Sequence, residues 1–269
     1  MKSARREFVR SVALALAGAR IAKLCAQTAQ PDQIEDLVLA SRILADHEVF
    51  DAYGHVSVRS DRDPQHFFMA RSLAPALVTR RDILEYDLDC NVVGGSPEFI
   101  KAALFLERFI HGEVYKARPD VKSVVHCHTP SVIPFGDTDV PLRPMFGLAG
   151  FLAGGVPVFE IRKGFGATDL LIRDPARGRA LAQTLGNKPV ALMRGHGAVV
   201  TGASLPLTVG RCIYLDMNAR VQQQTIALGG KAITYVTPAE GSLSVADDYR
   251  RGWELWRREA LAKMNSAGQ

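Results

Sequence analysis

Short apolar runs of the kind that form β-strands outnumber the helical segments that could connect them, and this ratio limits the folds open to the chain. The runs alternate or are continuously apolar, and turn-forming residues bound them. A parallel, doubly wound sheet needs a crossover helix between successive strands, so it does not suit this sequence. We therefore expect an α/β fold with a mixed or antiparallel sheet flanked by helices. The expected strands lie within residues 55–60, 66–72, 121–128, 155–161 and 188–200.

Longer segments have the apolar period of amphipathic helices. They cover residues 30–51, 97–116, 205–228 and 247–264. No repeat or low-complexity linker divides the chain, and its 47% hydrophobic content suits one large core. We expect a single domain over residues 30–269 that ends in a helix.

The first 29 residues have the character of a twin-arginine export leader. Arg5 and Arg6 precede Phe8 and a short apolar stretch, which Arg20 and Lys23 interrupt. A leader of this kind predicts a periplasmic protein that folds before export. The alternative is an amphipathic N-terminal helix of a cytoplasmic protein.

Composition excludes several classes of protein. The net charge is +5 without a basic block interleaved with aromatic residues, so we expect no nucleic-acid partner. Outside the N-terminal segment no apolar stretch is long enough to cross a membrane. A mild positive charge suits an anionic substrate. The cysteines lack CxxC spacing, so they do not predict a disulfide framework. They are Cys25, Cys90, Cys127 and Cys212.

Two histidines lie one residue apart at the end of the apolar run SVVHCHTP. Alternate side chains of a strand share a face, so His126 and His128 would point one way and Cys127 the other. Two imidazoles at this spacing can bind one metal ion. A strand end with two solvated histidines is the alternative.

A carboxylate and a third imidazole extend this pattern. Glu107 falls on the apolar stripe of the 97–116 segment, where a buried carboxylate needs an arginine or a metal ion as its partner. His111 follows one turn later and is expected to support the site. His196 lies between two glycines that let the backbone approach closely. Three imidazoles and a carboxylate suit one divalent ion such as Zn, Mn, Co or Fe.

The stretches LERFIHGEVYKARPDVKSVVHCHTP and LMRGHGAVVTG resemble the class II aldolase/adducin family, and the similarity covers roughly residues 32–230. The resemblance implies a three-layer αβα sandwich with a largely antiparallel central sheet. It also implies one divalent metal ion per subunit and a homotetramer with active sites at subunit interfaces. The matching metal ligands are Glu107, His126, His128 and His196.

The chain departs from the sugar-phosphate aldolases of this family. A glycine–asparagine segment that binds phosphate is replaced by Gly54-His55-Val56-Ser57, and a serine pair is replaced by Phe105-Leu106, which cannot hydrogen-bond phosphate. Gly147 and Leu148 stand where the aldolases have histidine and the proton-donating tyrosine. The resemblance therefore disfavours a sugar-phosphate aldolase.

A decarboxylating branch of the family has the G-H-V-S-x-R pattern found here in YGHVSVRS. Its members act on hydroxyarene carboxylates and on 2-hydroxy-3-carboxymuconate semialdehyde. This resemblance predicts a metal-dependent carbon–carbon lyase of aromatic-compound catabolism, most simply a decarboxylase. An aldolase acting on a non-phosphorylated carboxylated substrate and a non-catalytic, adducin-like assembly module are the alternatives.

Roles for individual residues follow from this chemistry. The metal ion, held partly by Glu107, would stabilise the enolate that forms when the carbon–carbon bond breaks. His55 would donate the proton that replaces CO2. Residues expected to contact the substrate, mainly its carboxylate, are Arg71, Ser72, Ser57 and Arg194.

Overall fold

The computed structural model describes residues 32–99, 101–229, 232–244 and 249–267. Residues Gln33–Gln269 form one compact unit. The expected export leader, residues 1–29, lies outside the described residues. In the described part of the chain no helix is long and apolar enough to cross a membrane. The homotetramer concerns contacts between chains and stays a prediction.

A single eight-stranded sheet forms the middle of the compact unit, in the order β4-β3-β2-β1-β5-β8-β7-β6. Every neighbouring pair is antiparallel except β6 and β7, which confirms the expected mixed and largely antiparallel sheet. The strands are β1 His55–Arg59, β2 His66–Ala70, β3 Ile83–Asp87, β4 Val92–Gly95, β5 Ser123–Cys127, β6 Val158–Phe159, β7 Val190–Met193 and β8 Gly197–Gly202.

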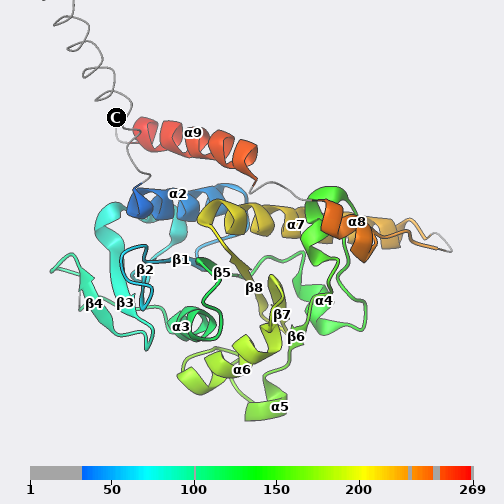
Figure 1. Cartoon of the computed structure of the whole chain (residues 1–269), viewed down its shortest axis with the longest axis horizontal. Helices are drawn as coiled ribbons and strands as arrows, with labels where there is room; N and C mark the ends of the chain where they lie inside the picture. Colours follow the sequence, from blue (N-terminus) through cyan, green and yellow to red (C-terminus); the bar gives the residue numbers. More distant parts are fainter. Residues whose placement is uncertain (1–31, 100, 230–231, 245–248, 268–269) are drawn as a thin grey trace, which may run out of the picture. The chain divides into compact units, whose positions relative to one another are not determined.

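Helices cover both faces of the sheet, which confirms the three-layer sandwich (Figure 1). The helices α2, α7 and α9 pack on one face, and α3 and α6 pack on the other. The period of strand β5 shows why two cores form, because Val125 and Cys127 join the first core while Val124 joins the second. The helices are α2 Gln33–Asp46, α3 Arg108–Ala117, α4 Ile133–Asp137, α5 Arg162–Phe165, α6 Pro175–Leu185, α7 Leu205–Ala227, α8 Pro238–Leu243 and α9 Arg250–Ala267, and the 3-10 helices are η1 Pro75–Leu77, η2 Arg80–Asp82 and η3 Gly147–Leu152.

Local chemistry explains where the main helices begin. Helix α7 starts after Ser204, whose hydroxyl accepts a hydrogen bond from the N–H of Leu207. Helix α6 starts in the same way after Asp174, and Gly186 ends it with a φ of 54°. Helix α9 contacts α2 and α7 through the buried Trp256 and its neighbours. The C-terminal helix is therefore docked on the core.

The predicted helix over 97–116 was wrong at its beginning. Helix α3 starts only at Arg108, and the residues before it are irregular. The reason is a competing hydrogen bond, because the carbonyl of Ala103 accepts from the N–H of Ser72 in a distant loop. In a helix that carbonyl would accept from residue 107. Glu107 therefore becomes the N-cap residue of α3, and it is buried as expected.

Candidate metal centre

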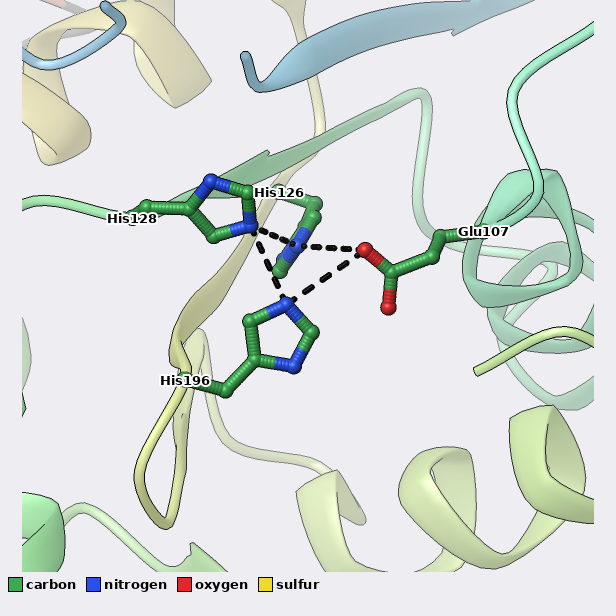
Figure 2. Close-up of side chains that lie close together, drawn as sticks. All are labelled: Glu107, His126, His128 and His196. Atoms are coloured by element: carbon green, nitrogen blue, oxygen red, sulfur yellow. Dashed lines mark hydrogen bonds and ion pairs between the residues drawn. The ribbon is translucent and has the colours of Figure 1, made fainter. Parts of the chain in front are cut away.

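Four side chains converge between the sheet and α3, and Figure 2 shows their polar atoms pointing toward one another. The Nε2 atoms of His126 and His128 lie 3.0 Å apart, as do those of His128 and His196. Oε2 of Glu107 lies 3.2 Å from Nε2 of His126 and 3.4 Å from Nε2 of His196. One ligand atom from each residue lies within 4.8 Å of all the others.

Separate elements carry these side chains to one point. His126 lies in β5, and His128 follows the end of that strand. His196 lies in the turn between β7 and β8, where Gly195 adopts a φ of 65° that favours glycine. Glu107 precedes α3. The pairing of β5 with β8 therefore joins residues that are about 70 positions apart in the sequence, as the hydrogen bond from His126 to Ala198 shows.

Gly197 is needed for the close approach of β8 to β5. A Cβ atom on Gly197 would lie 2.0 Å from the carbonyl oxygen of Cys127, so the strand would have to move. We expect Gly197→Ala to lower the free energy of unfolding by about 2–3 kcal/mol and the melting temperature by about 5–10 °C. Gly164→Ala is the matched control, because a Cβ there meets nothing within 4 Å. Equal thermal unfolding curves for the two variants would contradict this packing argument.

Backbone carbonyls set the proton positions on two of the rings. Nδ1 of His126 lies 3.1 Å from the carbonyl oxygen of Ala198, and Nδ1 of His196 lies 3.1 Å from that of Leu170. A carbonyl only accepts, so in each neutral ring the proton is on Nδ1 and Nε2 is a bare lone pair. The centre therefore directs lone pairs and a carboxylate oxygen at one point, which is the arrangement of a cation site.

The spacing of the donors fits a small divalent ion. Four donors at a tetrahedral zinc ion with bonds of 2.0–2.1 Å would be about 3.3 Å apart. Four of the six separations between these donors run from 3.0 to 3.4 Å, and all six lie within 4.8 Å. Nitrogen and carboxylate donors also suit manganese and cobalt, so the donor set fits the predicted class of metal without selecting one member.

Glu107 is held as an anion. Its Oε1 accepts a hydrogen bond of 2.9 Å from the N–H of Ile172, which turns Oε2 toward the histidines. Burial alone would raise the pKa of Glu107, but without a metal ion the charge and the N–H groups of protonated His126 and His196 outweigh burial and hold that pKa well below its usual range. Burial, with His126 and His196, lowers the pKa of His128 to about 4. The residues therefore favour a charged carboxylate and a neutral His128 at neutral pH.

A second cluster of buried polar side chains adjoins the metal ligands. His55 and His126 are partners across the β1–β5 ladder, and their ring centroids lie 5.2 Å apart. Nδ1 of His55 lies 2.6 Å from Nε2 of His111, and Nδ1 of His111 lies 2.6 Å from Oγ of Ser57. Oγ of Ser57 lies 2.7 Å from the hydroxyl of Tyr115. Burial first, then the charges of His111 and His126, hold the pKa of His55 well below its usual value.

Ser57, expected to contact substrate, belongs to this cluster. The side chain is fully buried, and its hydroxyl is shared between His111 and Tyr115. Its geometry therefore suits support of His55 better than contact with substrate. Sequence reasoning missed Tyr115, although Tyr115 follows His111 by four residues and so lies on the same side of α3.

The arginines expected to contact substrate are both partly exposed and both paired. Nε of Arg71 lies 2.7 Å from Oδ1 of Asp82. Nε of Arg194 lies 2.8 Å from Oε2 of Glu160, so this guanidinium forms an ion pair. The backbone of Ser72 hydrogen-bonds to Ala103, which ties its loop to the segment leading to the metal ligands.

Apart from the segment of His55 and Ser57, the positions that differ from the sugar-phosphate aldolases carry no polar side chain. The ring of Phe105 lies 4.5 Å from that of His55, centroid to centroid. Gly147 begins η3, and the side chain of Leu148 is 42% exposed. Neither Phe105 nor Leu148 can donate a proton or bind phosphate.

Comparison with known proteins agrees with this geometry. A family model for the class II aldolase and adducin N-terminal domain matches residues 35–223. The chain is 36% identical to decarboxylase tropJ of Talaromyces stipitatus, covering 84% of this chain and 93% of that protein. It is 30% identical to 3,4-dihydroxyphthalate decarboxylase of Terrabacter sp., covering 84% and 94%. The fold resembles L-fuculose 1-phosphate aldolase of Glaciozyma antarctica, with a TM-score of 0.71, 22% identity and coverage of 87% and 90%.

Proposed function

Since this chain belongs to the class II aldolase and adducin family, we propose that it is a lyase that uses a divalent metal ion to decarboxylate a hydroxy-carboxylic acid of aromatic-compound catabolism. The observation that carries the proposal is the convergence of three imidazoles and the carboxylate of Glu107 on one point. The similarity to two decarboxylases over most of the chain supports decarboxylation as the reaction.

The proposed metal ligands are Glu107, His126, His128 and His196. A divalent cation held by them would act as a Lewis acid that stabilises negative charge on a substrate oxygen. Glu107 lowers the net charge of the site, and the hydrogen bond from Ile172 fixes its orientation. Glu107 and His126 are buried and the other two ligands are partly buried, which limits the competition of water for the donors.

His55 is the proposed source of the proton. In the proposed reaction the bond from the substrate carbon to its carboxylate breaks, the electron pair stays on the substrate, and CO2 leaves. His55, protonated to the imidazolium once the anionic substrate is bound, gives a proton to that carbon and becomes the neutral ring, and a proton from solvent restores the imidazolium. The ring of His55 lies beside His126, and Phe105 packs against it, which limits its orientations.

Arg71 and Ser72 are the proposed contacts for a second substrate carboxylate. Asp82 binds Nε of Arg71, and the terminal nitrogens of Arg71 take no part in that ion pair. The Arg71 side chain is 28% exposed. A guanidinium held at one edge in this way can present its other nitrogens to a carboxylate. Arg194 is a further proposed contact, because it lies two residues before His196 and is partly exposed.

Release of CO2 tests the proposal directly. The protein loaded separately with zinc and with manganese is incubated with 3,4-dihydroxyphthalate and with simple o-hydroxyaryl carboxylates, and CO2 and aromatic products are measured. We expect CO2 from at least one of these compounds and none after treatment with a chelator. A protein that releases an aldehyde from a carboxylated aldol and no CO2 is an aldolase. A protein that binds metal but transforms none of these compounds contradicts the proposed reaction.

A further inference from the structure

A continuous hydrogen-bonded chain of side chains leads from α3 and β1 to His55. It runs from the hydroxyl of Tyr115 through Ser57 and His111, and its steps measure 2.7, 2.6 and 2.6 Å. All of its members are buried, and Ser57 and His111 have no exposed surface. Each side chain in this series can donate and accept a hydrogen bond, so the residues at its two ends decide in which direction the hydrogen bonds are donated.

Tyr115 sets the direction at the far end. Burial raises the pKa of Tyr115, so the phenol keeps its proton. Among the described residues, Oγ of Ser57 is the only acceptor recorded for that hydroxyl. The phenol therefore donates to Ser57. Ser57 has one hydroxyl proton of its own, and the partner left for it is Nδ1 of His111.

The direction then passes through His111 to His55. Burial first, then His126, lowers the pKa of His111 to about 3, so its ring is neutral. Because Nδ1 of His111 accepts from Ser57, the single proton of the ring is on Nε2 and is donated to Nδ1 of His55. The neutral His55 ring then has its own proton on Nε2. The opposite direction would leave the hydroxyl proton of Tyr115 buried without an acceptor, which folded proteins avoid.

We propose that Tyr115, Ser57 and His111 are positioning residues that hold His55 with its proton on Nε2, so that His55 presents a hydrogen-bond donor beside the metal centre. The inference rests on the proposed function, in which His55 gives a proton to the substrate carbon. His55 and His126 are neighbours across one strand pair, yet they differ in tautomer. His126 donates from Nδ1 to a carbonyl and offers a lone pair, whereas His55 accepts at Nδ1 and offers an N–H.

Nuclear magnetic resonance of the zinc-loaded protein tests the tautomers without substrate. The histidine rings are labelled with 15N, and two-bond proton–nitrogen correlations show which ring nitrogen of each histidine carries the proton. The His55 signals are assigned from their loss in His55→Gln. We expect His55 and His111 to carry their protons on Nε2, and His126 and His196 on Nδ1. A His55 ring with its proton on Nδ1 overturns the inference.

Two tyrosines provide a matched pair of variants. Tyr115 and Tyr86 are both buried and both pack against Phe67, with ring centroids 5.3 and 5.2 Å away. The hydroxyl of Tyr86 has no hydrogen-bond partner among the described residues. In Tyr115→Phe the Ser57 hydroxyl is free to accept from His111, so we expect a second His55 tautomer and a fall in kcat of about tenfold. We expect Tyr86→Phe to change neither, and identical behaviour of the two variants overturns the role of Tyr115.

Variants of Ser57 distinguish a role in positioning His55 from a role in binding substrate. In Ser57→Ala the chain is broken, so we expect kcat to fall about tenfold or more while KM stays within a factor of two. Ser57→Thr keeps the hydroxyl, and we expect it to recover most of kcat. A Ser57→Ala variant with a raised KM and an unchanged kcat shows that Ser57 contacts substrate and overturns the inference.

Failure of this inference and failure of the proposed function are distinguishable. The tautomers are read in the resting protein, so their assignment needs no turnover. If the protein releases CO2 but the His55 proton is on Nδ1, the inference is wrong and the proposed decarboxylation still stands. The expected tautomers with no CO2 release count only against the proposed reaction.

Discussion

His126→Ala is expected to abolish high-affinity metal binding and to lower activity by roughly 10³-fold or more, because loss of the metal removes several kcal/mol of charge stabilisation. His126 is fully buried, and its Nε2 lies within 3.2 Å of both His128 and Glu107. Replacing a residue that only supports a metal ligand typically weakens binding about 10–100-fold, so loss of a direct ligand has a larger effect. Elemental analysis and calorimetric titration with zinc measure the affinity.

Thermal unfolding provides an independent readout of the same site. Zinc at 100 times its dissociation constant stabilises a native protein by about 2.7 kcal/mol, which corresponds to a rise in melting temperature of about 5–10 °C for a chain of this size. We expect this rise in the wild type and its absence in His126→Ala. The control is His66→Ala, because His66 bonds to Glu85 on the neighbouring strand and is not among the four converging residues. Equal zinc affinity and equal thermal shifts in the two variants would show that these four residues do not form the metal site.

The strands were easier to predict from the sequence than the boundaries of the elements. The alternating runs around His55 and His126 became β1 and β5, because period-2 patterns report which side chains face a core. The run over 188–200 became parts of two strands, β7 and β8, with His196 at the turn. Strands β3 and β4 were missed, and the 155–161 run contributes only two residues to β6. Hydrogen bonds between distant segments decide such boundaries, and a local pattern does not contain them.

The sequence alone predicts more about the four proposed metal ligands than about the residues that contact His111. Burial of Glu107 follows from its place among apolar residues, although the helix expected around it begins one residue later. Its meeting with His196 depends on the pairing of β5 with β8, which spacing does not show, so the family resemblance carried that prediction. Ser57 and Tyr115 are ordinary residues in the sequence. Only the register of β1 against β5 and the position of α3 bring them to His111.

His55→Ala is expected to lower kcat by about 10²–10⁴-fold while the bound metal and KM stay close to wild-type values, because general acid catalysis contributes a factor of this size. The prediction separates His55 from the metal ligands, which lie on the same side of the sheet. The ring of His55 lies 5.2 Å from that of His126, and its Nδ1 is occupied by His111. Steady-state CO2 release and elemental analysis of the same samples measure the two quantities.

Two outcomes would contradict this assignment in different ways. Loss of metal together with activity would make His55 a ligand, which conflicts with an Nε2 that carries a proton. Retention of kcat within about threefold would require another acid, since general acid catalysis is worth far more than that. His47→Gln is the control, because the His47 ring packs against Trp256 on the opposite core and is absent from both polar clusters. A large fall in kcat confined to His55→Ala, with the metal retained, identifies the proton donor by its chemistry because the metal site remains intact.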